Sequence, residues 1–206
     1  GRASHVEGAF NIVNGDYSHA EGMFTRTHGS GSHAEGLYTT GSGIGSHAEG
    51  YRSLAAGFGS HAEGGSRVSE WDIIVYGEKQ TFALGDFSHA EGSETIAQGL
   101  ASHAEGSASF AIGNFAHAEG ERNFAIGSSS HAEGALTTAS ADFSHTEGHS
   151  TRATGFASHA EGGNFDPFFW PSQIYQPYAV VASGDFSHAE GYSTQAAGLY
   201  SHAEGI

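Results

Sequence analysis

The heptapeptide DFSHAEG occupies residues 86–92 and recurs letter for letter at residues 185–191. Close copies run through the whole chain, and in each copy a histidine is followed two residues later by a glutamate. The thirteen motif histidines are His5, His19, His33, His47, His61, His89, His103, His117, His131, His145, His159, His188 and His202. Ten of the twelve intervals between them are 14 residues long. A fixed period predicts a repeat architecture in which each unit stacks on the next.

A second signal lies seven residues out of phase with the first. The segments TIAQG (95–99), TRATG (151–155) and TQAAG (194–198) share the pattern small-x-Ala-x-Gly with SHAEG. Each half unit therefore gives about five residues of alternating character, typical of a short strand, and ends at a glycine that we expect to take a positive φ at a corner. The sequence predicts an all-β fold, a parallel β-solenoid with 14-residue coils, forming a single repeat domain over residues 1–206.

Two longer segments interrupt the repeat at the same point of the coil, just after HAEGGS and HAEGGN. They are residues 67–80 (RVSEWDIIVYGEKQ) and 165–179 (FDPFFWPSQIYQPYA). They contain both tryptophans and all three prolines of the chain. We expect these insertions to form loops or hairpins that project from the coils.

The alternation along a strand sorts the side chains between two sides. Ser88 and Ala90 face one way, whereas His89 and Glu91 face the other. A 14-residue coil is too narrow to enclose histidine and glutamate, so we expect the Ser, Thr and Ala columns inside and the His and Glu columns on one outer face. The opposite outer face varies from coil to coil, with pairs such as Arg26/His28, Thr40/Ser42, Leu54/Ala56, Phe82/Leu84, Ile96/Gln98, Phe110/Ile112, Phe124/Ile126 and Arg152/Thr154.

The composition restricts the class of protein. The formal charge is −16, and Lys plus Arg total only 7, too few for a surface that neutralises phosphates, so nucleic acid is excluded as a partner. No cysteine is present, which fits an extracellular or virion protein. No apolar run is long enough to cross a bilayer, and we expect no membrane insertion of this segment. Because the chain opens at Gly1 within the repeat pattern, we also expect it to be a fragment.

The segments SFAIGNFAHAEG (109–120) and NFAIGSSSHAEG (123–134) resemble the YadA-like head repeats of trimeric autotransporter adhesins, with their S-V-A-I-G pattern. SHAEG arrays are also similar to those in surface and phage fibre proteins. The resemblance covers most of the chain outside the insertions. It implies a left-handed β-roll, a homotrimer, and motif side chains that face the partner chains. Here His and Glu replace the Val and Ile of the family pattern, and Ala141 stands where a corner glycine is expected.

The repeated His-x-Glu pair has several interpretations. An active site needs a few groups in unlike surroundings, whereas this array offers many alike, so we predict that the protein is not an enzyme. We interpret the two columns as pairing with each other, within a coil, between coils or between chains; a simple solvated polar face is the alternative. The predicted interface residues are His19, Glu21, His33, Glu35, His47, Glu49, His89, Glu91, His103, Glu105, His117, Glu119, His131 and Glu133.

The same columns raise the questions of metal binding and of pH dependence. Zinc and nickel accept imidazole and carboxylate ligands, but a column of pairs does not by itself create a closed tetrahedral site. We therefore expect no cofactor and no resident metal, only adventitious Zn²⁺ or Ni²⁺ at the His columns. If pairing dominates, the histidine pKa values rise and the assembly is firmest at low pH; burial alone would lower them and reverse the trend.

The insertions supply the candidate ligand-binding residues, because loops on a rigid scaffold often carry binding sites. These candidates are Trp71, Tyr76, Phe168, Phe169, Trp170, Tyr175 and Tyr178, with Glu70, Asp72 and Asp166 as polar contacts. Their aromatic rings would stack on sugars or on a protein ligand; the alternative is that they only anchor the loops. On the variable face, the Phe and Ile pairs in mid-chain form either a covered patch or a recognition surface.

Together these features predict a structural and adhesive segment of an extracellular trimeric fibre, which presents the aromatic loops to a host surface glycan or protein. Two alternatives remain open. One is a segment of a phage tail fibre or tailspike that binds host polysaccharide, which would place the protein on a virion rather than on a cell surface. The other is a hydrolase that acts at the insertions.

Overall fold

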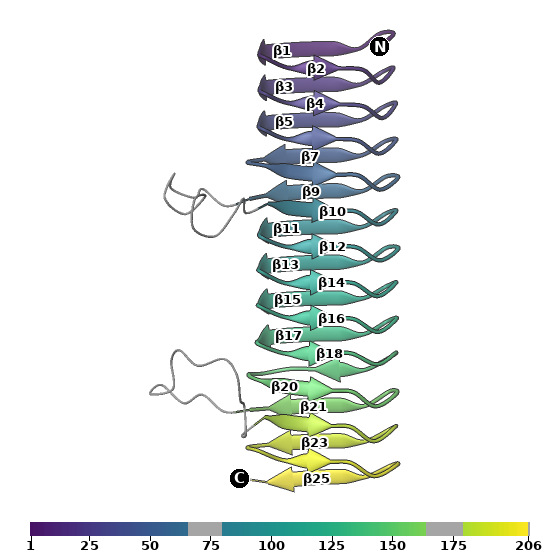
Figure 1. Ribbon diagram of the computed structural model, residues 1–206, viewed down its shortest axis with the longest axis vertical. Coiled ribbons are helices and arrows are strands. Elements are labelled where there is room, and N and C mark those ends of the chain that lie inside the picture. Colours follow the sequence, from purple (N-terminus) through teal and green to yellow (C-terminus); the bar gives the residue numbers. More distant parts are fainter. Residues whose placement is uncertain (66–79, 164–178, 206) are drawn as a thin grey trace, which may run out of the picture. The chain divides into compact units, whose positions relative to one another are not determined.

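The computed structural model describes residues 1–65, 80–163 and 179–205, and all the regular structure in these ranges is β (Figure 1). The chain divides into two compact units, Gly1–Ser109 and Phe110–Ile206. No helix within the described residues is long and apolar enough to cross a membrane. The prediction of an all-β fold is confirmed.

In the first unit, long and short strands alternate along the chain. They are β1 (His5–Ala9), β2 (Ile12–Val13), β3 (His19–Met23), β4 (Arg26–Thr27), β5 (His33–Leu37), β6 (Thr40–Gly41), β7 (His47–Gly50), β8 (Ser53–Ala55), β9 (His61–Gly64), β10 (Thr81–Ala83), β11 (His89–Ser93), β12 (Ile96–Ala97) and β13 (His103–Ser107). The odd-numbered strands form one parallel sheet in the order β1-β3-β5-β7-β9-β11-β13, and the even-numbered strands form the other, β2-β4-β6-β8-β10-β12.

The second unit repeats this arrangement. Its strands are β14 (Phe110–Ala111), β15 (His117–Glu121), β16 (Phe124–Ala125), β17 (His131–Ala135), β18 (Thr138–Ala139), β19 (His145–Thr146), β20 (Thr151–Ala153), β21 (His159–Gly162), β22 (Val180–Ala182), β23 (His188–Gly191), β24 (Gln195–Ala196) and β25 (His202–Gly205). The sheets run β15-β17-β19-β21-β23-β25 and β14-β16-β18-β20-β22-β24. Each unit is thus a parallel β-solenoid with two strands per coil, as predicted.

The register places every motif residue beside its own counterpart in the next coil. His33 pairs with His47, and Ala34 pairs with Ala48. The pairing is not interrupted at the longer intervals, because His61 pairs directly with His89. His159 likewise pairs with His188. Residues of one kind therefore form continuous columns in each unit.

The interior of the coils consists of small side chains, as the alternation predicted. Ala20, Ala48, Ala97 and Ala132 are each 0 % exposed, and the motif serines are 1–2 % exposed in most coils. The serine hydroxyl donates to the carbonyl oxygen three residues earlier, as Ser130 Oγ does to Gly127 O at 2.7 Å. This bond gives the buried hydroxyl a partner, and it adds a second donor to a corner carbonyl that already accepts from the Ser130 N–H at 3.2 Å.

The corners depart in part from the prediction. The glycine of SHAEG takes the expected positive φ, which is 107° at Gly36. The glycine of the other half, such as Gly113, does not, so the expectation of a positive φ there is wrong. A Cβ on Gly113 would lie 2.0 Å from the carbonyl oxygen of Gly127 in the next coil, so close backbone approach favours glycine at this position, although Ala141 occupies it in one coil. The left-handed residue at this corner comes two places later and is often aromatic, as with Phe115 at φ 59°.

Two residues larger than Ser and Thr are fully buried in the interior column of the short-strand half of the second unit. Val180 pairs with Thr151 in this column, and Asn123 is the other. Its amide nitrogen donates to Glu119 O and, at 2.8 Å, to Gly134 O. Its oxygen accepts from the backbone N–H of Thr137 at 2.9 Å. The side chain is therefore fully engaged, which makes its burial acceptable.

Candidate functional site

The candidate site is the outer face of the long-strand sheet in each unit, which carries the His and Glu columns. The extended backbone of these strands turns His33 and Glu35 of β5 to the same side, away from Ala34. Both side chains are half-buried, with 33 % of His33 and 44 % of Glu35 exposed. All the predicted interface histidines and glutamates lie on this face of their own unit, on strands β3, β5, β7, β11, β13, β15 and β17.

From His19 onward, the imidazole rings stack on one another along each column, whereas the rings of His5 and His19 meet edge-on at 89°. The ring centroids of His33 and His47 are 4.5 Å apart and the rings are 1° from parallel. The spacing is 4.7 Å for His159 and His188. The strand separation of a parallel sheet imposes this spacing, and the identical register of each coil imposes the parallel orientation. The rings therefore form an ordered stack rather than a set of independent side chains.

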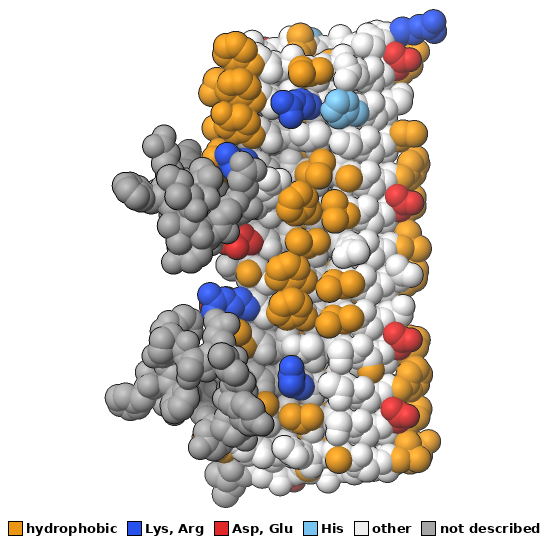
Figure 2. Space-filling model, in the orientation of Figure 1, with side chains coloured by type: hydrophobic (Ala, Val, Ile, Leu, Met, Phe, Trp, Pro, Cys, Tyr) orange, Lys and Arg blue, Asp and Glu red, His pale blue; other side chains and the backbone are white. Residues whose placement is uncertain are grey.

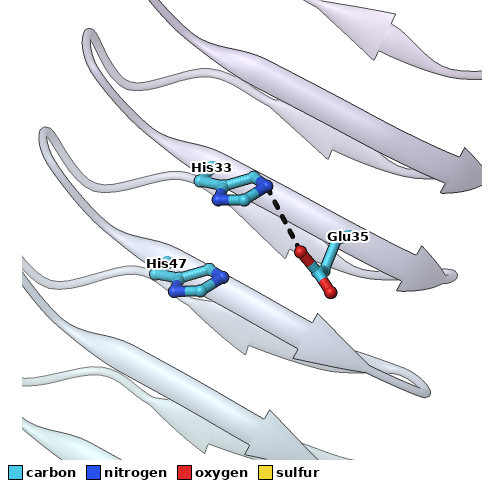
Figure 3. Close-up of side chains that lie close together, drawn as sticks. All are labelled: His33, Glu35 and His47. Carbon is cyan, nitrogen blue, oxygen red and sulfur yellow. Dashed lines mark ion pairs between the residues drawn. The ribbon is translucent and has the colours of Figure 1, made fainter. Parts of the chain in front are cut away.

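Each carboxylate lies near the histidine of its own coil, and several also approach the next histidine. His33 Nε2 is 3.6 Å from Glu35 Oε2 (Figure 3). Glu161 spans two rings, with Oε2 3.7 Å from His159 Nε2 and Oε1 3.7 Å from His188 Nε2. These separations exceed the 2.7–3.2 Å of an ordinary hydrogen bond to nitrogen. The predicted pairing is therefore present within and between coils, but as electrostatic proximity rather than as hydrogen bonds.

The Nε2 atoms are more buried than the side chains that carry them. In the described residues, the Nε2 atoms of His33, His47, His61, His89 and His131 have almost no solvent access and no hydrogen-bond partner. A buried nitrogen without a partner is uncommon in native proteins and calls for an explanation. Such a row of ring nitrogens beside carboxylates could hold protons, cations or a partner surface.

Burial lowers the pKa of three column histidines below the ordinary 6.5. For His33 the largest cause is desolvation, followed by repulsion from the imidazoles of His47 and His19. Glu35 and Glu21 act in the opposite direction, but more weakly. Desolvation is also the first cause of the lowered pKa values of His89 and His145. Within a single chain, the expected rise from pairing is thus reversed at these histidines by burial.

The predicted ligand-binding residues of the two insertions lie outside the described residues. They are Trp71, Tyr76, Phe168, Phe169, Trp170, Tyr175 and Tyr178, together with the polar residues Glu70, Asp72 and Asp166.

A ridge of exposed aromatic side chains, which we did not expect from the sequence, lies at the corner before the motif serine. In the first unit it includes Tyr17, Phe58 and Phe87, and in the second Phe115 and Phe143. Figure 2 shows hydrophobic side chains interspersed with carboxylates along the right-hand edge of the view. A carboxylate of this corner can accept a backbone N–H of the preceding coil, as Asp86 Oδ1 does from Phe58 at 2.8 Å. The sequence did contain a signal for this ridge, because an aspartate and a phenylalanine directly precede SHAEG in DFSHAEG (86–92).

The short-strand face is mixed in character, as its variable sequence predicted (Figure 2). In the second unit the rings of Phe110 and Phe124 stack at 4.9 Å, and Ile112 and Ile126 beside them are partly exposed. In the first unit Arg26 is exposed at the corresponding place. This face therefore has no single chemistry, in contrast to the His and Glu columns.

Comparisons with known proteins add no constraint on function. No family model matches the chain, and no curated protein matches it.

Proposed function

We propose that the chain is a structural and adhesive segment of an extracellular fibre, a homotrimer of left-handed coils joined through the His and Glu face. The observation that supports this most is the uniformity of that face within each unit. Its histidines and glutamates repeat in register, half-buried, while the short-strand face changes from coil to coil. A uniform surface suits a partner that is itself a repeat, and a second and third copy of the same chain meet that requirement.

The order of the face favours association. Parallel stacking at 4.5–5.0 Å already restricts the imidazoles before any partner binds. Side chains that are fixed in advance lose little conformational entropy at an interface. In addition, the half-buried rings leave apolar edges that a partner chain can cover.

The same uniformity is why we propose no catalytic role. General acid–base catalysis needs groups whose surroundings move their pKa values apart. Here His33, His89 and His145 share the same kind of neighbours, and their pKa values all move in the same direction for the same first cause. A structural role needs only this repetition.

The adhesive part of the proposal assigns binding to exposed aromatic side chains, either on the insertions or on the corner ridge. Aromatic rings that protrude from a rigid scaffold can stack on the apolar faces of sugars. Tyr17 and Phe87 are 70 % and 59 % exposed, which leaves their rings available for such contacts.

Solution mass tests the assembly. Sedimentation equilibrium should give three times the chain mass of 21.3 kDa. Glu49→Arg, on the His and Glu face, should shift the equilibrium toward the monomer because it replaces the carboxylate 3.4 Å from His61 Nε2 by a longer, cationic side chain at the interface. Thr40→Arg is the matched control on the short-strand face, where the paired position in the preceding coil is already Arg26. A wild-type monomer, or equal dissociation of both variants, would contradict the proposed interface.

A glycan array with the folded chain tests adhesion separately. Binding that decreases in Phe87→Ser would place the contact on the corner ridge, whereas binding that survives would favour the insertions. Failure to bind any glycan or host surface protein would remove the adhesive part of the proposal and leave only the structural role. Release of shortened saccharides would support the hydrolase alternative instead.

A further inference from the structure

The His and Glu columns bring ligand atoms together in threes. One such triplet consists of His33, Glu35 and His47, and its three candidate ligand atoms all lie within 4.8 Å of one another (Figure 3). The same arrangement recurs within each unit. Further triplets are His47/Glu49/His61, His61/Glu63/His89, His89/Glu91/His103 and His117/Glu119/His131. Each triplet is contained in one chain, so it does not require the proposed trimer.

We propose that these triplets bind first-row divalent cations, with Zn²⁺ as the best fit. Each ion would be held by two successive motif histidines and by the glutamate of the first of the two coils. Imidazole and carboxylate are donors that zinc accepts, and three protein ligands leave a fourth position for water or for a group from another chain.

The donor separations within a coil favour a shared ion over a hydrogen bond. An ion bound tetrahedrally with bonds of about 2.0–2.1 Å holds its donor atoms about 3.4 Å apart. His131 Nε2 and Glu133 Oε2 are 3.5 Å apart, and His33 Nε2 and Glu35 Oε2 are 3.6 Å apart. These pairs are too far apart for an ordinary hydrogen bond, but they are close to the distance between two ligands of one zinc ion.

The buried ring nitrogens provide an independent reason. His33 Nε2 and His47 Nε2 are nearly inaccessible to solvent and have no hydrogen-bond partner. Coordination to an ion would satisfy both lone pairs at once. It would also offset the repulsion between successive carboxylates, since Glu21 and Glu35 are paired in register on neighbouring strands.

The stacked rings limit how many ions can bind. Because Nε2 has a single lone pair, His47 cannot serve both of its triplets at the same time. Filled triplets must therefore alternate along a column, with one ion for each two coils. For thirteen motif histidines this gives about six ions per chain at saturation. The second histidine of each filled triplet must also tilt out of the parallel stack to direct its lone pair at the ion.

Zinc uptake by the full chain tests the proposal. The protein is equilibrated with Zn²⁺ and dialysed, and retained zinc is measured by mass spectrometry. We expect about six ions per chain, one for each two of the thirteen motif histidines, and a higher melting temperature with Zn²⁺ than with EDTA. The control His28→Gln removes a histidine from the short-strand face, where it lies beside Asn14 Nδ2 at 3.1 Å, and should retain the wild-type number.

Two variants in neighbouring coils test the pairing of histidines. His47→Gln leaves an odd number of motif histidines on each side within the first unit, so one ion per chain should be lost. His61→Gln leaves even numbers on both sides, so the alternating ions can shift and none should be lost. Far-ultraviolet circular dichroism checks the fold, and His89→Gln replaces His47→Gln if the latter does not fold.

Three outcomes would overturn the proposal. The first is retention of less than one zinc ion per chain after dialysis. The second is an equal loss of zinc in His28→Gln and His47→Gln. The third is an equal loss in His47→Gln and His61→Gln, which would show that an ion does not need two successive histidines. None of these outcomes depends on whether the chain is a trimer, since each is measured per chain.

Discussion

The two halves of a coil have the same interior and different exteriors. In both halves most of the buried side chains are Ala, Ser or Thr, as in Ser32 and Ala34 of one half and Thr95 and Ala97 of the other. Outside, one half carries His and Glu in every coil, whereas the other carries arginine, threonine, leucine or phenylalanine. The fold therefore requires the interior pattern in both halves, but it does not require a fixed exterior. The constant exterior of the long-strand half must serve another purpose, which we propose is assembly and cation binding.

Substitution of a corner glycine should have the largest effect on stability, because some of these glycines leave no space for a Cβ. Others leave space for it. In Gly36→Ala, φ 107° excludes the side chain and the new Cβ would lie 2.2 Å from Gly50 O. We expect a loss of about 4 kcal/mol in the free energy of unfolding, from strain and overpacking together. Gly31→Ala is the control in the same coil, with φ 66° and nothing within 4 Å of the new Cβ.

The control should cost only about 1 kcal/mol, because the left-handed region is accessible to alanine at modest cost. Urea unfolding of the two variants measures both values. Similar losses would show that the corners tolerate a side chain equally and would remove the distinction between them.

The next largest effect should come from the buried amide of the short-strand half. Asn123→Ala leaves Gly134 O and the Thr137 N–H without their partners, so we expect a loss of about 2–3 kcal/mol in the free energy of unfolding. Asn123→Thr restores the residue type that other coils have in this column and should cost less than half as much. If Asn123→Ala is no worse than Asn123→Thr, the amide network does not stabilise the coil.

A smaller effect is expected at the serine of the long-strand half. Ser130→Ala removes the 2.7 Å bond to Gly127 O and should destabilise the protein by about 1 kcal/mol. The reverse substitution can also be made, because Ala116 occupies the serine position in one coil and is only 1 % exposed. Ala116→Ser should therefore raise the midpoint of urea unfolding, and a decrease would argue against the role of this bond.

The smallest effect per residue should come from the titration of the imidazole column. The pKa values of His33, His89 and His145 are lowered in the folded chain, first by burial and then by neighbouring imidazoles. The unfolded chain then binds more protons just below pH 6.5, so stability is fully present above that pH and decreases as the pH falls through the lowered pKa values. The groups that face His33 are His19, His47, Glu21 and Glu35.

We therefore expect the melting temperature of the metal-free protein, measured in EDTA, to fall between pH 7.5 and pH 5. His28→Gln should leave this dependence unchanged, since His28 lies on the short-strand face outside the columns. A melting temperature that rises on acidification would show that assembly adds enough His–Glu pairing to outweigh burial.

Much of the fold could be predicted because covalent geometry makes successive side chains of a strand point to opposite sides. Once SHAEG is a strand, Ser88 and Ala90 must share one side and His89 and Glu91 the other. The parallel register followed as well, since only pairing of identical positions keeps every small residue inside. Phe143 shows where this reasoning failed. A bulky residue in the left-handed region is disfavoured locally, but here the Phe143 N–H donates to Ser128 O of the preceding coil at 2.9 Å.

The sequence by itself determined the period, the small-residue interior, and the face on which histidine and glutamate lie, because these depend on the spacing and alternation of residues. Tertiary structure decided the quantities that depend on a few tenths of an ångström between coils. These include the approach of Gly127 O to Gly113, the 3.4 Å between Glu49 Oε1 and His61 Nε2 of the next coil, and the burial that lowers the pKa of His33. Such contacts arise only when successive coils are stacked, so no local pattern in the sequence encodes them.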